Sequence, residues 1–179
     1  MKLALLSDIH ANIQAFEACL AHARSQGADQ FALLGDLVGY GADPVAVVSR
    51  AQGLAGEGAL LIKGNHDEMA VEPPVEVRTI GDSTAAWTHL QLNDSQRKFL
   101  DDLPMTLQQG TALLVHASLD GPELWRYVYD ERAAKASLDA AADMPEVVAD
   151  VLEPGDSAQQ RGLARSRRPQ HRGHRPGGH

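Results

Sequence analysis

Four short apolar runs lie along the chain, and each is followed at once by polar residues. They are KLALLSD at 2–8, QFALLGD at 30–36, GALLIKGNHD at 58–67 and TALLVHAS at 111–118. Continuously apolar runs of this length are typical of strands that are covered on both faces. We therefore predict four buried strands.

Between these runs the apolar positions recur at helical spacing. The expected helices span 12–27, 43–53, 83–92, 94–103 and 130–143. Asn12 is placed to cap the first helix, and Pro44 fits the first turn of the second. The order β-α-β-α-β-α-α-β-α predicts an α/β domain with a largely parallel sheet.

The composition indicates a globular protein. The chain has 179 residues, of which 44% are hydrophobic and 22% charged. The single cysteine, Cys19, excludes an intramolecular disulfide, fits a reducing compartment, and is interpreted as a packing residue. No apolar run reaches the roughly 18 residues of a spanning helix, and no signal-peptide pattern opens the chain. We predict a cytoplasmic protein without a membrane partner.

Charge is distributed unevenly. Residues 1–154 contain 10 Lys and Arg against 23 Asp and Glu, a net charge of −13, whereas residues 155–179 contain six Arg and one Asp, a net charge of +5. An acidic body disfavours nucleic acid as its partner and suits cations. Because apolar periodicity stops near Gly155, we predict a domain at 1–154 and a basic, disordered tail at 155–179.

Polar side chains that can bind metals follow all four predicted strands. They are Asp8 and His10, Asp36, Asn65 with His66 and Asp67, and His116. The carboxyl ends of parallel strands meet at one edge of a sheet, where α/β proteins bind ligands. Asp8 and His10 share a direction if the backbone between them is extended. Carboxylate, amide and imidazole groups together suit two divalent transition ions, which can clamp a phosphoryl group.

The segments LLSDIHAN, LLGDLVGYGADP, LIKGNHD and LLVHAS resemble, in this order, the motifs of the calcineurin-like metallophosphoesterases. The similarity is greatest to small bacterial, phosphodiesterase-like members and covers about residues 1–140. It implies a four-layer α/β/β/α sandwich with a dinuclear metal centre. The two divalent ions would be manganese, iron, zinc, nickel or magnesium.

The resemblance also implies a role for each motif residue. Asp8 and His10 would hold the first ion, Asp36 would bridge both ions, and Asn65 and His116 would hold the second. A hydroxide bridging the ions would attack phosphorus in line.

His66 would contact the substrate phosphate and help to protonate the leaving oxygen. Asn65 and Tyr40 are the other candidate substrate contacts, although Tyr40 could equally pack the turn in which it lies. Gly64 would allow a tight turn. Asp67 either orients His66 or, as we favour, caps the following turn.

Two features depart from the family pattern. Protein serine/threonine phosphatases of the superfamily carry G-D-x-V-D-R-G, but Gly39 and Tyr40 replace the second Asp and the Arg here. This disfavours phosphoproteins and favours a small phosphodiester or a nucleotide as substrate. The family also closes its metal site with a later G-H-x-H segment, which is absent from this sequence. We therefore predict a metal-dependent phosphoesterase with impaired activity.

The basic tail follows a patterned body, which indicates a truncated or frameshifted family member with an incomplete second sheet. The nucleotide sequence beyond the codon for Asp150 tests this hypothesis, because a shifted frame should encode G-H-x-H. The alternatives are a basic arm for nucleic acid or other polyanions, and metal capture by His171, His174 and His179.

A non-catalytic phosphate- or nucleotide-binding module is the alternative to an enzyme. In either case the expected partner is a small phosphate ester, nucleic acid is expected only at the tail, and a homo-oligomer is left open. Trp125 and Tyr127 are interpreted as covering the core rather than lining the cleft. His22 and His89 are interpreted as surface or packing residues.

Overall fold

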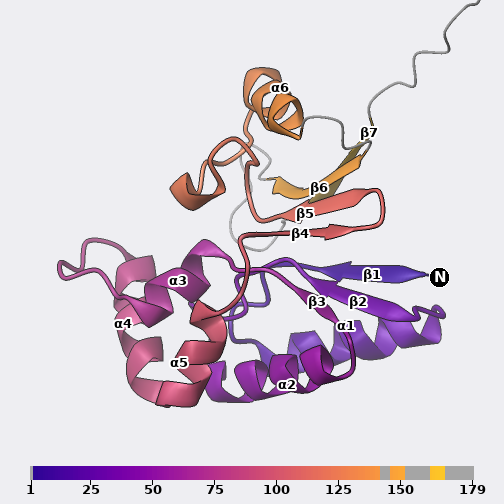
Figure 1. Cartoon of the computed structure of the whole chain (residues 1–179). Coiled ribbons are helices and arrows are strands. Elements are labelled where there is room, and N and C mark those ends of the chain that lie inside the picture. The colour runs from indigo at the N-terminus through magenta and orange to yellow at the C-terminus, as the bar shows by residue number, and fades with distance from the viewer. Residues whose placement is uncertain (1, 142–145, 152–161, 168–179) are drawn as a thin grey trace, which may run out of the picture.

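The computed structural model describes residues 2–141, 146–151 and 162–167. In these ranges the chain forms two β-sheets that are stacked face to face, with helices on both outer sides (Figure 1). The layers follow one another as α/β/β/α, which confirms the predicted architecture.

The first sheet is parallel and has the order β1-β2-β3. Its strands are β1 (Leu3–Leu6), β2 (Gln30–Leu33) and β3 (Leu60–Leu61). Leu6 pairs with Leu33, and Leu33 with Leu61, so the three strands end at the same edge of the sheet. That edge carries the loops of the candidate site.

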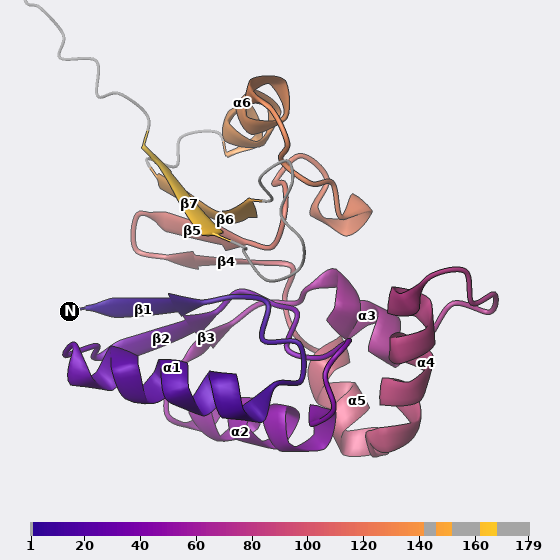
Figure 2. The same ribbon diagram turned by 180° about the vertical axis from the view of Figure 1, so that it is seen from behind.

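Two helices cover the outer face of this sheet (Figures 1 and 2). They are α1 (Ile13–Ser25) and α2 (Pro44–Gly56). The Asn12 side chain accepts a hydrogen bond from Ala15 N at 2.9 Å and caps α1, as predicted. Pro44 occupies the first position of α2, where its missing N–H is not needed.

The strands of the first sheet are continuously apolar because alternate residues enter two different cores. Phe31 and Leu33 belong to the core beneath α1 and α2, whereas Ala32 and Leu34 belong to the core between the two sheets. Leu114 of the second sheet completes that inner core. Burial on both faces explains why these strands were recognisable in the sequence.

The second sheet has the order β4-β5-β6-β7 and mixes strand directions. Its strands are β4 (Thr106–Gln109), β5 (Ala112–Val115), β6 (Glu146–Val151) and β7 (Gly162–Arg167). The β5–β6 pair is parallel, and the other two pairs are antiparallel. The prediction of a single, largely parallel set of strands is therefore wrong for the fourth apolar run, which forms β5.

Three strands of the second sheet were not predicted. β4 reads TLQQ, and such a polar stretch carries no strand signal, although it pairs along its whole length with β5. β7 lies within the predicted tail, where its backbone pairs with that of β6 over residues 162–167. The disorder expected for the tail stays a prediction. The rest of 155–179 lies outside the described residues, and the division at residue 154 stays a prediction.

The remaining helices lie at the end of the first sheet and above the second. Helices α3 (Asn65–Val71), α4 (Ile80–Gln91) and α5 (Asp94–Asp101) gather beside the carboxyl ends of the parallel strands (Figure 1). The short 3₁₀ helix η1 (Pro122–Leu124) precedes α6 (Glu131–Ala140), which covers the outer side of the second sheet. None of the helices in the described ranges is long and apolar enough to cross a bilayer.

Gly35 and Gly64 allow two backbone segments to touch where the strands end. A Cβ atom at Gly35 would lie 2.6 Å from Gly64 N, and Gly35 has a φ of +92°. We expect Gly35→Ala to lower the free energy of unfolding by at least about 2 kcal/mol, because it adds a steric clash to an unfavourable conformation. Urea denaturation measures the difference.

Gly53→Ala is the matched control. A Cβ atom at Gly53 meets Arg50 Nη1 at an ordinary 3.9 Å, inside helix α2. This substitution should stabilise the protein by up to about 1 kcal/mol. Equal urea midpoints for the two variants would show that the Gly35–Gly64 contact does not constrain the fold.

Candidate metal centre

The loops after β1 and β2 run side by side and carry the acidic residues of the site. His10 N donates to Asp36 O, and Ala11 N donates to Leu37 O, both at 2.9 Å. Asp8, His10, Ala11 and Asp36 all have φ between 47° and 55°. This left-handed conformation is unfavourable for residues other than glycine and is concentrated at functional sites.

The prediction that an extended backbone aligns Asp8 with His10 is therefore wrong in its reason, although the two side chains do meet. His10 Nε2 lies 3.3 Å from Asp8 Oδ1 and 3.7 Å from Asp36 Oδ2. The ligand atoms of these three residues all lie within 4.8 Å of one another. In the part of the chain that the structure describes, no other cluster of His, Cys, Asp and Glu meets this criterion.

His116 reaches the same place from the second sheet. Its Nε2 lies 3.2 Å from Asn65 Oδ1 and 3.7 Å from Asp36 Oδ1. The Asp36 carboxylate therefore lies between two histidines, with Oδ2 toward His10 and Oδ1 toward His116. The structure thus brings together all five residues that were predicted to hold metal ions.

His10 and His116 are held in the same way, with Nδ1 at a backbone carbonyl oxygen. His10 Nδ1 lies 3.2 Å from Val38 O, and His116 Nδ1 lies 2.8 Å from Leu34 O. A carbonyl only accepts hydrogen bonds, so Nδ1 must carry the proton in each neutral ring. Nε2 is then an acceptor, and it faces the oxygens of Asp36 or Asn65.

An acceptor nitrogen that faces carboxylate or amide oxygens is unfavourable unless a cation lies between them. His10 Nε2 is buried and has no hydrogen-bond partner among the described residues. Imidazole Nε2 atoms fixed by carbonyls at Nδ1 are the usual arrangement of metal-ligating histidines. The residues present therefore fit divalent metal ions.

The electrostatic environment of Asp36 also favours a bound cation. Burial, followed by the Asp67 carboxylate, raises the pKa of Asp36 from 3.8 to about 7, although His10 and a hydrogen bond from His66 N oppose the shift. His66 N donates to Asp36 Oδ1 at 2.8 Å. A cation beside Asp36 would favour the ionised form that can act as a ligand.

His66 lies on the first turn of α3, with only 4% of its surface exposed. Its ring packs edge-on against His10, with ring centroids 5.1 Å apart, and lies 4.6 Å from the Tyr40 ring. Burial, followed by electrostatic interaction with His10 and His116, lowers the pKa of His66 from 6.5 to about 4. His66 is therefore neutral at pH 7 in this structure.

Gly39 and Tyr40, which depart from the phosphatase motif, both contact His66. A Cβ atom at Gly39 would lie 2.8 Å from His66 Nδ1, so a side chain does not fit there. Tyr40 packs edge-on against His10, with ring centroids 4.9 Å apart. Burial raises the pKa of Tyr40, and negative charge on Asp36 and Asp82 raises it further.

Asp67 connects α3 to the loop that carries Asp36. Its carboxylate accepts hydrogen bonds from Gly64 N at 3.0 Å and from Val38 N at 3.2 Å. Burial raises the pKa of Asp67, while these bonds oppose the shift. Asp67 is a capping residue, as favoured, but it caps the start of the turn in which it lies, and its bond to Val38 was not foreseen.

Trp125 and Glu68 are neighbours of the site, and Glu68 was not identified from the sequence. Trp125 packs edge-on against His116, with ring centroids 5.9 Å apart, and its Nε1 donates to Glu68 Oε2 at 2.6 Å. Of the two interpretations of Trp125, these contacts favour a position beside the cleft. His89 does pack as expected, because its Nδ1 lies 2.9 Å from Ala70 O.

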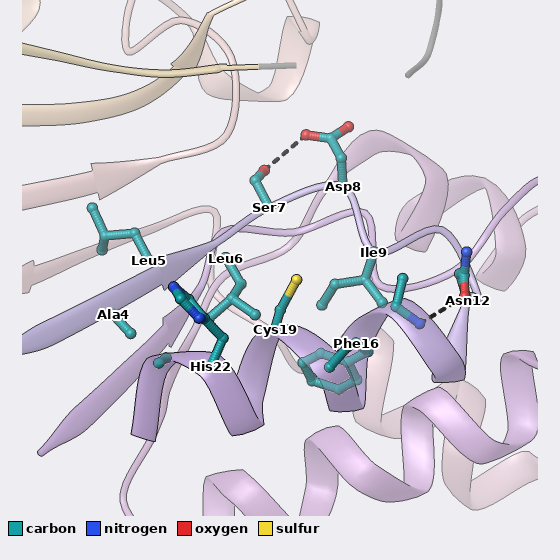
Figure 3. A pocket seen from close by; sticks show the side chains of 13 residues that line it. Ala4, Leu5, Leu6, Ser7, Asp8, Ile9, Asn12, Phe16, Cys19 and His22 are labelled. Carbon is teal, nitrogen blue, oxygen red and sulfur yellow. Dashed lines mark hydrogen bonds between the residues drawn. The ribbon is translucent and has the colours of Figure 1, made fainter. Parts of the chain in front are cut away.

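A separate cavity of about 650 Å³ lies between β1 and α1 (Figure 3). Leu6 and Phe16 are among its apolar walls, and Cys19 is exposed to it rather than packed in a core. Figure 3 shows Ser7 and Asp8 pointing away from α1, joined by a hydrogen bond of 2.9 Å. This cavity offers no cluster of metal ligands.

The tail histidines His171, His174 and His179 lie outside the described residues. Their capture of a metal stays a prediction, as does the shifted reading frame.

We expect Asp67→Ala to lower the free energy of unfolding by about 2–4 kcal/mol, because it leaves two buried backbone N–H groups without acceptors. Asp130→Ala is the control, since Asp130 is an exposed cap that accepts one bond, from Ala133 N at 2.8 Å. Its loss should cost about 1 kcal/mol. Chemical denaturation measures both variants, and equal losses would argue against the connecting role of Asp67.

Comparison with known protein families identifies a match over residues 1–150 to the calcineurin-like phosphoesterase superfamily domain. An uncharacterized protein of Methanocaldococcus jannaschii is 31% identical over 135 residues, which are 72% of this chain and 54% of that protein.

Solved structures give the same result. A metallophosphoesterase from Sphaerobacter thermophilus is 32% identical, with a TM-score of 0.69, over 81% of this chain and 58% of that one. A protein proposed to be a diadenosine tetraphosphatase is 26% identical, with a TM-score of 0.53, over 66% of this chain and 50% of that one. The chain thus spans between half and three-fifths of the lengths of these relatives. On the family match, the fold and the shared motifs, this chain belongs to the calcineurin-like phosphoesterase superfamily.

Proposed function

We propose that the chain binds two divalent metal ions and hydrolyses a small phosphodiester or a nucleotide. The observation that carries this proposal is the position of Asp36, whose two carboxylate oxygens face His10 on one side and His116 on the other. The solved relative proposed to be a diadenosine tetraphosphatase supports a nucleotide as one such substrate.

Each ion would have its own ligands, with Asp36 shared. Asp8 and His10 would hold the first ion, and Asn65 and His116 the second. Two divalent ions at these positions would neutralise charge on a phosphoryl group and lower the pKa of a bound water. The mixture of imidazole, carboxylate and amide ligands suits divalent transition ions, of which manganese is the one used in the tests below.

The chain's own groups would orient the substrate and move the proton. His66 lies beside the triad and can donate a hydrogen bond to a phosphate oxygen. A bound phosphate places negative charge beside His66, which raises its pKa and allows it to carry the proton that the leaving oxygen needs. Asn65 and Tyr40 would contact the same substrate.

We also propose that turnover by this chain is weak. The family resemblance assigns further ligands to a G-H-x-H segment, and the sequence contains none. Each ion would then have fewer protein ligands than in a complete site, and its affinity would fall. A cytoplasmic location and assembly with a second copy remain predictions.

A phosphate- or nucleotide-binding module without turnover is the second candidate. It is favoured by the same missing segment, because the cleft residues remain together while the ligand set is short. The two candidates differ in their dependence on metal: the module would bind phosphate esters without added ions.

We expect isothermal titration calorimetry with Mn²⁺ to detect binding by the full chain. Loss of a residue that only hydrogen-bonds to a metal ligand lowers metal affinity by roughly 10–100-fold. Asp36→Asn should weaken Mn²⁺ binding by more than this, because it alters a ligand that both ions share. His22→Ala is the control, since His22 is exposed and lies on α1. Wild-type affinity in Asp36→Asn would rule out the shared-ligand role.

We expect slow, Mn²⁺-dependent hydrolysis of bis(p-nitrophenyl) phosphate. His66→Ala should lower kcat by about 10²–10⁴-fold while leaving Mn²⁺ affinity unchanged, because His66 handles a proton rather than an ion. A parallel loss of kcat and Mn²⁺ affinity would make His66 a structural or ligating residue. Binding of this ester without metal, and without turnover, would favour the module.

A further inference from the structure

A cavity of about 450 Å³ opens beside the candidate metal centre. Two loops form it, residues 8–12 after β1 and residues 40–43 before α2. Asp8 and His10 lie at its wall, so a ligand in this cavity is next to the triad. Its lining residues include no lysine or arginine.

Tyr40 supplies the aromatic surface of this cavity. Its side chain is 44% exposed although one part of the ring packs against His10 and His66. Its backbone has a φ of 58°, which is unfavourable for a bulky residue. A strained, exposed aromatic beside a cluster of ligands is more readily explained by ligand contact than by stability.

Asp43 supplies an acceptor that the fold does not use. It precedes α2, yet its side chain makes no capping hydrogen bond, whereas Asn12, Thr79 and Asn93 cap their helices with theirs. The half-buried carboxylate forms no hydrogen bond or ion pair with the described residues. The Asp43 N–H, which donates to Ala11 O at 2.9 Å, holds the residue at the cavity.

We propose that this cavity binds the nucleoside portion of a nucleotide ester whose phosphate lies at the triad. The base would stack on Tyr40, and the ribose hydroxyls would donate hydrogen bonds to Asp43. The side-chain amide of Gln14, which also lines the cavity, can donate to and accept from the edge of a base. This assignment rests on the proposed phosphoesterase function and names its substrate class.

A cationic alcohol such as choline is the competing occupant, because an aromatic ring and a carboxylate also recognise a quaternary ammonium group. The volume and the amide of Gln14 favour the nucleoside, since choline uses neither. The two occupants are separated by experiment.

The test is a titration of the full, isotope-labelled chain with adenosine, followed by the backbone amide signals of Gly41 and Ala42. We expect saturable shifts with adenosine and none with choline at the same concentration. Adenosine has no phosphate and needs no metal, so the assay is independent of ion binding and hydrolysis.

Variants then assign the contacts. Asn tolerates the left-handed backbone conformation at position 40, so Tyr40→Asn should leave the loop intact. It should weaken adenosine binding at least about fivefold, because the stacking surface is lost. Tyr40→Phe should stay within about twofold of wild type because it keeps the ring. Asp43→Ala should weaken binding about three- to tenfold. Tyr129→Ala, which removes an exposed tyrosine elsewhere, is the control.

Absence of adenosine binding, binding of choline in its place, or wild-type affinity in Tyr40→Asn would each overturn the nucleoside assignment. These outcomes leave the proposed function standing if Mn²⁺ binding and hydrolysis are seen. Conversely, loss of Mn²⁺ binding with intact adenosine binding would overturn the proposed function and leave the cavity assigned.

Discussion

The contact between the Asp36 loop and the start of α3 is the constraint on which the rest of the site depends. Gly35 and Gly64 allow the two backbones to touch, and His66 N donates to Asp36 Oδ1 at 2.8 Å. The side chain of Asp67, on α3, accepts a hydrogen bond from Val38 N. Because these bonds are buried, they fix the Asp36 carboxylate and the His66 ring relative to each other.

This arrangement concentrates negative charge in a buried place. Asp36 and Asp67 are both fully buried, and burial raises the pKa of each carboxyl. Such a pair is unfavourable by itself, and cations are the natural compensation. The residues around the site that adopt left-handed backbone conformations also raise the free energy of the fold. The backbone hydrogen bonds between the two loops offset this cost.

The structure brings together the residues that were singled out from the sequence, whereas the geometry of their meeting was not predicted. Asp8 and His10 were expected on extended backbone, but left-handed turns bring them together. His116 was expected beside the other strands, yet it follows β5 of a second sheet and meets Asn65 at 3.2 Å. Glu68 carried no local signal, because its bond to Trp125 beside His116 joins segments that are distant in the sequence.

The sequence by itself determined the parallel sheet, its covering helices and the identity of the candidate ligands. Burial on both faces makes those strands continuously apolar, and polar residues at strand ends stand out against them. Only the tertiary structure decided how the second sheet is assembled and which oxygens of Asp36 face which histidine. β4 reads TLQQ and carries no strand signal, yet its backbone pairs with β5 along its whole length. Contacts such as Gly39 with His66 depend on distances between segments that no local pattern encodes.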